Sequence, residues 1–268
     1  MAANGIETIG PGPIRRALEA TESLGKSLAK YDVTAAAAYG TAAFRTATNG
    51  LALKVELEDR IKIPIQVIDG QREAALISKG VLAAGLPIGE RYLIMDIGGG
   101  SVEFILVENG EICFSESYPI GAQVLRQGFH KQEPLRKEQT ESPQEEALFK
   151  HLDTRLTSLR AAVKDGAKLV GASGTFDVLG DLYGEDVNDA VKRLSAAKVF
   201  SLYEEAVRMT EDDRIADERL PKDRADMIVV ALALIVYVLR IYPQEDILTC
   251  DYALKEGALF EMASAREK

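Results

Sequence analysis

The sequence predicts an α/β protein of two lobes, in which strands pair in parallel within a layered fold. Short apolar runs that favour strands alternate with longer segments of helical periodicity, and this alternation is typical of parallel sheets. Two glycine-rich turns, at residues 98–101 and 171–175, each follow an apolar run. The 268 residues are 47% hydrophobic, which is enough for a sizeable core.

The first lobe, residues 1–88, should alternate helices and strands. Prolines at the start and apolar residues at helical spacing predict a helix over 14–31. The pattern then predicts, in order, a strand at 33–38, a helix at 41–57, an edge strand at 63–68 and a helix at 73–81. The glycines and proline at 85–89 form a linker, and we expect a ligand to lie between the lobes.

The second lobe, residues 89–268, should open with strands at 92–95 and 104–107. The dipeptide Asn109-Gly110 is a hairpin signal that introduces a third strand at 111–118. Residues 130–146 are polar and contain two prolines, which favours a solvated surface loop. Further strands are expected at 168–172 and 246–249, and helices at about 187–210, 224–241 and 253–262. The apolar run 227–239 is too short to span a membrane and is interpreted as a core helix.

Composition argues against several classes of function. A net charge of −10 disfavours a nucleic-acid-binding surface. The two cysteines, Cys113 and Cys250, lie far apart in sequence and do not form a disulfide framework, which favours a reducing compartment. We therefore expect a soluble cytoplasmic protein without a signal peptide, and with neither nucleic acid nor membrane as a partner.

The turn between the first two strands of the second lobe carries the clearest chemical signal. It consists of Gly98, Gly99, Gly100 and Ser101. Consecutive glycines let the backbone approach an anion and present several N–H groups to it. Asp96 and Glu103 flank the turn, and carboxylates beside phosphate oxygens are typical ligands of Mg²⁺. An ordinary glycine-rich hairpin turn is the alternative interpretation.

A second phosphate-loop candidate comes later in the chain. It consists of Ser173, Gly174 and Thr175. These residues follow one predicted strand and precede a helix, so their N–H groups would point toward an anion with the helix dipole behind them. Taken alone this turn is weak evidence, and it gains weight from the first loop.

Two charged residues of the first lobe are candidates for catalysis. Glu73 falls in the first turn of a helix, where it is either a general base that takes a proton from water or a carboxylate that complements the helix dipole. Arg45 follows a strand and either clamps phosphate through its guanidinium fork or is a surface helix arginine.

These motifs, in this order, resemble the exopolyphosphatase/guanosine pentaphosphate phosphatase (Ppx/GppA) family of the sugar kinase, Hsp70 and actin superfamily. The matching segments are YGTAAFRTATNG, VIDGQREAALISKGV, YLIMDIGGGSVEFIL, PIGAQVLRQGF, LVGASGTFDVLG, DRADMIVVALALI and YALKEGALFEM. The resemblance implies a two-lobed actin-like, ribonuclease H-like fold. It also implies hydrolytic release of orthophosphate from inorganic polyphosphate or from guanosine pentaphosphate, with guanosine tetraphosphate as a related nucleotide partner.

The resemblance also implies a role for each candidate residue. Glu73 would be the catalytic base that activates water, and Arg45 would contact phosphate. Asp96 and Glu103 would hold Mg²⁺, while the two glycine-containing loops would bind phosphate. Phosphoryl transfer depends on positioning, charge and a base more than on covalent chemistry, so these roles are mutually consistent.

Two departures from the family pattern keep other functions open. The first departure is Arg72, at a position where the family often has a second acid before the catalytic glutamate. The second concerns the phosphate-binding hairpin with which the family pattern opens. We expect this hairpin to be absent from these 268 residues. Without that hairpin, open sheet edges would favour a homodimer or higher oligomer. A catalytically weak nucleotide- or polyphosphate-binding regulatory protein is therefore the alternative, and an ATP-dependent kinase is disfavoured because the second lobe lacks a clear adenosine-binding glycine motif.

Overall fold

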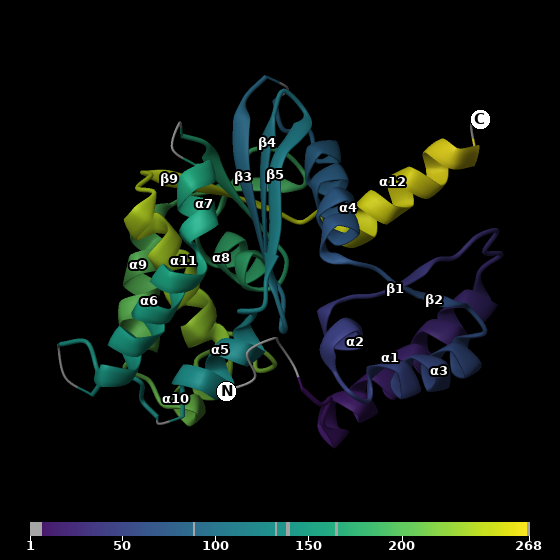
Figure 1. Ribbon diagram of the computed structural model, residues 1–268, viewed down its shortest axis with the longest axis horizontal. Helices are drawn as coiled ribbons and strands as arrows, with labels where there is room; N and C mark the ends of the chain where they lie inside the picture. Colours follow the sequence, from purple (N-terminus) through teal and green to yellow (C-terminus); the bar gives the residue numbers. More distant parts are fainter. Residues whose placement is uncertain (1–6, 88, 132, 138–139, 164–165, 267–268) are drawn as a thin grey trace. The chain divides into compact units, whose positions relative to one another are not determined.

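The computed structural model describes residues 7–87, 89–131, 133–137, 140–163 and 166–266. Its chain divides into two compact units, Met1–Glu73 and Ala74–Lys268, and each is described by itself. Both are built from helices and strands, so the predicted α/β class is confirmed (Figure 1). The lobe boundary near residue 88 stays a prediction.

The smaller unit packs helices against a two-stranded sheet. Its elements are α1 (Pro11–Lys30), β1 (Ala38–Gly40), α2 (Ala42–Thr46), α3 (Gly50–Ile61) and β2 (Ile65–Val67). Strands β1 and β2 pair in parallel, as predicted. The core consists of Leu53, Leu57 and Ile65, against which apolar residues of α1 pack.

Two predictions for the smaller unit are wrong in detail. The strand expected at 33–38 begins only at Ala38, because residues 33–37 are exposed and would bury no apolar surface by pairing. The helix expected at 41–57 is broken into α2 and α3, with Ala47 in an extended conformation. Gly50 lies so close to α2 that a Cβ there would come 2.8 Å from the Phe44 carbonyl oxygen, which fixes the break.

Helix α4 (Gly70–Ala83) begins where the smaller unit ends. Asp69 caps it, since the Arg72 N–H donates to Asp69 Oδ1 at 2.8 Å. The apolar face of α4 packs in a core cluster with Tyr92 and Ile94 of the larger unit. Glu73 therefore lies in the first turn of a helix whose remaining turns are firmly packed.

A seven-stranded mixed sheet forms the centre of the larger unit, in the order β5-β4-β3-β6-β9-β8-β7. The strands are β3 (Arg91–Ile97), β4 (Val102–Glu108), β5 (Glu111–Tyr118), β6 (Lys168–Ala172), β7 (Glu185–Asp186), β8 (Val191–Ser195) and β9 (Asp246–Cys250). The turn between β4 and β5 has Asn109 and Gly110 at positive φ, which confirms the predicted hairpin.

Further helices follow in the larger unit, and the last of them packs against α4 (Figure 1). They are α5 (Ala122–Phe129), α6 (Pro143–Arg155), α7 (Thr157–Ala162), α8 (Thr175–Tyr183), α9 (Ala196–Ala206), α10 (Glu211–Ala216), α11 (Ile228–Ile241) and α12 (Leu254–Arg266). Residues 228–239 of α11 are all buried, which explains a helix that is apolar all round and confirms the predicted core helix. Within the described residues, no helix is long and apolar enough to cross a membrane.

The helix predicted from residue 187 is wrong in its first part. Residues 191–195 instead form β8, which pairs antiparallel with β9, and α9 begins only at Ala196. Asn188 turns the chain into this strand, because its side-chain oxygen accepts from the N–H groups of Ala190 and Val191, both at 2.9 Å. Only tertiary pairing with β9 distinguishes this short segment from a helix.

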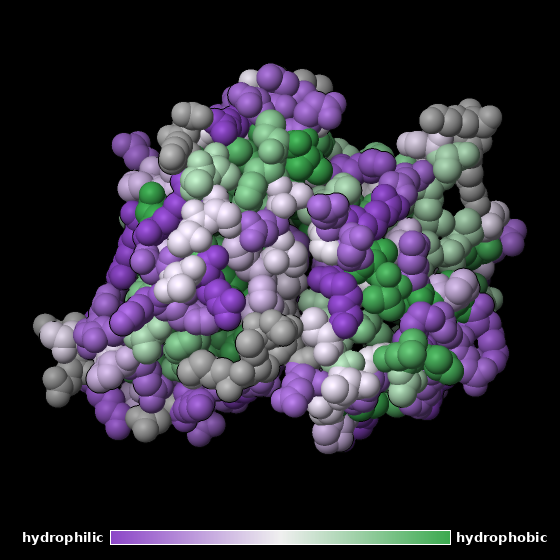
Figure 2. All heavy atoms as spheres, in the orientation of Figure 1, coloured by the Kyte–Doolittle hydropathy of each residue, from purple (hydrophilic) through white to green (hydrophobic). Residues whose placement is uncertain are grey.

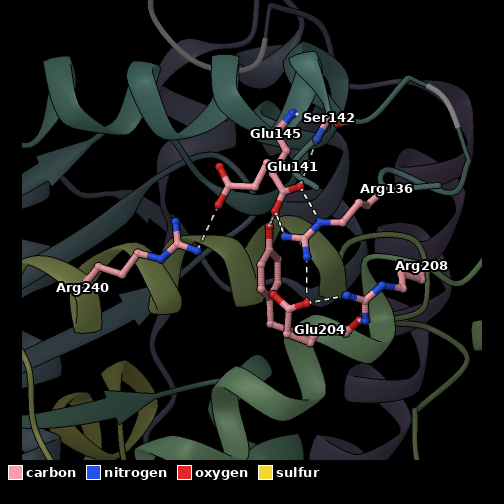
Figure 3. Close-up of polar contacts among 8 residues, drawn as sticks. Arg136, Glu141, Ser142, Glu145, Glu204, Arg208 and Arg240 are labelled. Atoms are coloured by element: carbon pink, nitrogen blue, oxygen red, sulfur yellow. Dashed lines mark hydrogen bonds and ion pairs between the residues drawn. The ribbon is translucent and has the colours of Figure 1, made fainter. Parts of the chain in front are cut away.

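The prediction of a solvated loop over 130–146 is wrong in part. Residues 132, 138 and 139 lie outside the described residues, and the other residues between α5 and α6 form a loop with several exposed positions. Leu135, Arg136 and Glu145 are buried, with Glu145 fully so. Arg136 donates to Glu145 and to Glu204, and the Tyr203 hydroxyl donates to Glu145 at 2.6 Å (Figure 3). The sequence suggests solvation because Arg136 and Glu145 are charged. In the fold these two side chains are buried together, and each compensates the charge of the other.

Exposed hydrophobic side chains occur on the smaller unit. Leu24, Tyr31, Leu51 and Val55 are each more than half exposed, and hydrophobic atoms are visible on this unit among hydrophilic ones (Figure 2). Single exposed apolar side chains are ordinary on protein surfaces. The predicted homodimer stays a prediction.

Candidate functional site

Arg45 and Glu73 form a partly buried ion pair in the smaller unit. Arg45 Nη1 donates to Glu73 Oε2 at 2.6 Å and to the Ile68 carbonyl at 2.8 Å. The side chains are 20% and 8% exposed, so Arg45 is not the surface arginine that the sequence left as an alternative. Among the described residues, Nε and Nη2 of Arg45 donate to no other group and are available to an oxyanion.

The environment of Glu73 raises the pKa of its carboxyl group above the ordinary value. Burial is the largest cause, and the hydrogen bond and charge of Arg45 oppose it. A raised pKa makes a carboxylate a stronger proton acceptor near neutral pH. The arrangement therefore suits a general base that is oriented by its arginine partner.

The glycine turn of the larger unit is docked against the beginning of α5. The N–H groups of Ala122 and Gln123 donate to the carbonyls of Gly98 and Gly99, at 2.9 and 3.0 Å. With these carbonyls held, the N–H groups of Gly99 and Gly100 make no hydrogen bond within the described residues. Unpaired amides of this kind can bind an anion, and the phosphate loop stays a prediction.

Asp96 and Glu103 are directly opposed on the antiparallel strands β3 and β4, so their side chains share one face of the sheet. Both are buried, at 9% and 2% exposure. Glu103 Oε1 accepts from the hydroxyls of Ser101 and Ser117, at 2.6 and 2.7 Å. Opposed like charges are unfavourable in a sheet, and a cation between them would relieve that repulsion.

The second loop meets the first through its serine. The Ser173 hydroxyl donates to Asp96 Oδ1. Ser173 and Gly174 both have positive φ, and Thr175 begins α8. The predicted strand, tight turn and helix N-terminus are therefore all present, and the loop lies beside the carboxylate that flanks the glycine turn.

Arg224 is a site residue that the sequence reasoning missed. Its guanidinium lies over the second loop, so that a Cβ at Gly174 would come 2.7 Å from Arg224 Nη1. Together with Gly98, Gly99 and Thr175, it lines a cavity of about 30 Å³, room for a group of the size of a water molecule or one phosphate oxygen. In sequence, Arg224 is the polar start of a predicted helix, and the signal that could have found it is its place in the family-matching segment DRADMIVVALALI.

The donor set at Asp96 and Glu103 fits Mg²⁺. Hard oxygen ligands suit this ion, which usually takes one or two protein carboxylates and keeps water and substrate phosphate as its other ligands. Within the described residues, no cluster of three or more His, Cys, Asp or Glu side chains could hold a metal ion by itself. Two opposed carboxylates beside phosphate-binding turns are thus the kind of partial site that a phosphate substrate would complete.

A sequence model of the Ppx/GppA phosphatase family matches residues 3–266. The chain belongs to this family. A Vibrio vulnificus family relative named guanosine-5'-triphosphate,3'-diphosphate pyrophosphatase is 30% identical over 226 residues, which are 84% of this chain and 44% of the relative. The chain therefore spans less than half the length of that relative.

Solved Ppx/GppA structures share the fold. The crystal structure of an exopolyphosphatase from Cytophaga hutchinsonii has a TM-score of 0.88 and 32% identity, covering 96% of this chain and 84% of that chain. An Aquifex aeolicus family member has a TM-score of 0.77 at 20% identity, covering 97% of this chain and 84% of that chain. The predicted α/β fold is confirmed as that of the Ppx/GppA family.

Proposed function

We propose that this chain hydrolyses terminal phosphoanhydride bonds and releases orthophosphate from inorganic polyphosphate, from guanosine pentaphosphate, or from both. Membership of the Ppx/GppA phosphatase family supports the reaction type. The relatives support the substrates, because one is named as an exopolyphosphatase and another as a guanosine-5'-triphosphate,3'-diphosphate pyrophosphatase.

The single observation that carries the proposal is the buried Glu73 carboxylate held by Arg45. Glu73 takes a proton from a water molecule, and the water oxygen bonds to the terminal phosphorus. The bond from that phosphorus to the bridging oxygen breaks, and the shortened phosphate chain leaves with the electron pair. A well-placed base of this kind contributes about 10²- to 10⁴-fold to the rate.

The larger unit supplies groups for binding the anion. The free amides of Gly99 and Gly100, the N-terminus of α8 and the Arg224 guanidinium all carry positive charge or partial charge. Asp96 and Glu103 would hold Mg²⁺, which neutralises phosphate charge when bound. These groups place and polarise the terminal phosphate, while Glu73 performs the proton transfer.

The test is orthophosphate release from tripolyphosphate and from guanosine pentaphosphate, measured with Mg²⁺ and with EDTA. Glu73→Gln should lower kcat by about 10²- to 10⁴-fold with little change in KM. Glu146→Gln is a matched control, because Glu146 also lies in the first turn of a helix, α6, but is exposed. Equal activity of the two variants would refute the role of Glu73.

The alternative, a weakly catalytic binding protein, is separated by the same samples. Tight binding of tripolyphosphate or guanosine tetraphosphate without orthophosphate release from either substrate would favour regulation over hydrolysis. Release from only one of the two substrates would identify the preferred one. Release that EDTA abolishes and Mg²⁺ restores would support the carboxylate pair as the metal site.

A further inference from the structure

The small cavity beside the glycine turn has two walls that come from different parts of the larger unit. Gly98, Gly99 and Ala122 form one wall, at the turn and the beginning of α5. The other wall consists of Thr175 of α8 together with Arg224, Met227 and Ile228, at the beginning of α11. The distance between the walls decides whether the amides and the Arg224 guanidinium reach the same anion.

Each wall is internally fixed by backbone hydrogen bonds. On the first wall, the α5 amides bind the turn, and Gly121 approaches so closely that a Cβ there would lie 2.5 Å from the Gly99 carbonyl. On the second, the N–H groups of Met227 and Ile228 donate to the Arg224 carbonyl, at 3.0 and 2.9 Å. These bonds fix the glycine turn against α5, and fix Arg224 against the beginning of α11.

Residues of both walls pack in one hydrophobic core, and Arg126 adds an ion pair between them. Arg126, one helical turn beyond Ala122, places Nη1 3.4 Å from Asp226 Oδ2. Asp226 lies between Arg224 and Met227 in the turn that forms the second wall. The other arm of the guanidinium, Nη2, donates to Glu211 of α10 at 2.9 Å, which is outside the cavity lining.

We propose that Arg126 is a positioning residue, which sets the spacing between the glycine turn and Arg224 through its ion pair with Asp226. The inference rests on the proposed function only in taking phosphate as the ligand of this cavity. Both partners are about one-third exposed, at 30% and 33%, so the bond is partly shielded from water. Without this ion pair the packed core still holds the walls together, but the position of Arg224 relative to the glycine turn is less well fixed, and the amides and the guanidinium then bind one anion less well.

The test uses the two partners of the same guanidinium as a matched pair. Asp226→Asn should raise KM for tripolyphosphate about tenfold and change kcat less than about threefold, because the base Glu73 is untouched. Glu211→Gln removes the other bond of Arg126 and should leave KM within about twofold. Arg126→Met should match Asp226→Asn, and Arg126→Lys should recover part of the affinity, since a lysine keeps the charge but not the fork.

Binding is measured separately from turnover by calorimetry with tripolyphosphate in the Glu73→Gln background. Weaker binding in Asp226→Asn but not in Glu211→Gln supports the inference, even where the enzyme releases no orthophosphate. Hydrolysis by the native chain with equal KM in both variants overturns the inference while the proposed function stands. Failure of the native sequence to bind tripolyphosphate overturns the inference as well, because the cavity is then no anion site.

Discussion

Substitution of the buried Arg136 tests how much its ion pairs contribute to the stability of the larger unit. Arg136 is 4% exposed and contacts Glu145, which is fully buried, through Nε at 2.8 Å and through Nη2. Its Nη1 also donates to Glu204 at 2.7 Å (Figure 3). Arg136→Met would leave the Glu145 carboxylate buried with only the Tyr203 hydroxyl and its helix-capping contact.

Removing one partner of a buried ion pair costs about 3–5 kcal/mol in the free energy of unfolding. Arg208→Met is the matched control, because Arg208 binds the same Glu204 oxygen at 2.7 Å but both side chains are more than 40% exposed. An exposed pair of this spacing contributes about 0.3–0.5 kcal/mol. For a unit of this size, the two losses correspond to roughly 6–20 °C and at most about 2 °C in Tm.

The contribution of the Arg136–Glu145 pair to the free energy of unfolding should depend on pH in a defined direction. Burial raises the pKa of Glu145, but the hydrogen bonds from Arg136 and Tyr203 outweigh it and hold that pKa below its ordinary value. The pair therefore stabilises the fold at neutral pH, and this contribution is lost as the pH falls through the lowered pKa. In Arg136→Met the main influence that lowers the pKa of this carboxyl group is lost and burial should raise that pKa, so the difference in stability from the native chain should shrink as the pH falls below the raised value.

Urea unfolding followed by circular dichroism at pH 7 and pH 4 measures both quantities. The double variant Arg136→Met/Glu145→Gln should recover most of the loss, because glutamine keeps the capping contact and removes the buried charge. Equal destabilisation by Arg136→Met and Arg208→Met at pH 7 would refute the reasoning, since burial would then contribute nothing.

Three further outcomes follow from the candidate site. The proposed base Glu73 has a raised pKa, so activity should fall with decreasing pH already above the range of an ordinary glutamate. Arg45→Met should move this limb of the pH–rate profile to still higher pH, because it removes the influence that lowers the pKa of Glu73; a limb that moves to lower pH would contradict this. Gly121→Ala should lower the free energy of unfolding in urea by about 1–3 kcal/mol, because the new Cβ would lie 2.5 Å from the Gly99 carbonyl. An unchanged free energy of unfolding would show that the turn can shift without cost and would contradict this prediction. Asp96→Asn should raise the Mg²⁺ concentration for half-maximal phosphate release about tenfold, and an unchanged metal titration would exclude Asp96 as a ligand.

Sequence pattern alone located the features that depend on local chemistry. The β5 strand was predictable to the residue because Asn109 and Gly110 accept the positive φ of a tight hairpin. Glu73 was predictable as a candidate base from its place in the first turn of a helix after a strand. The helix predicted at 14–31 and the buried α11 were equally clear, because periodicity and apolar length are properties of the segment itself.

The features that the sequence could not supply depend on distant partners. Residues 191–195 become a strand only through pairing with β9, and Glu145 becomes an interior residue only because Arg136 compensates its charge. Arg224 joins the site because the chain folds it over Gly174, fifty residues earlier. Helices α6 and α7 were not predicted, since α6 begins inside the polar segment that was interpreted as a loop.

The docking of α5 explains how a flexible glycine turn is held in one conformation at the proposed anion site. Each glycine loses more conformational freedom on folding than any other residue, at a cost of roughly 0.5–1 kcal/mol relative to alanine. The first amides of α5 bind the carbonyls of the turn, so the helix N-terminus is not itself the anion site. The bonds orient the turn so that the amides of Gly99 and Gly100 stay unpaired. The segment PIGAQ is therefore as much a part of the candidate site as the three glycines. The glycines permit the conformation of the turn, and the hydrogen bonds from PIGAQ hold the turn in that conformation.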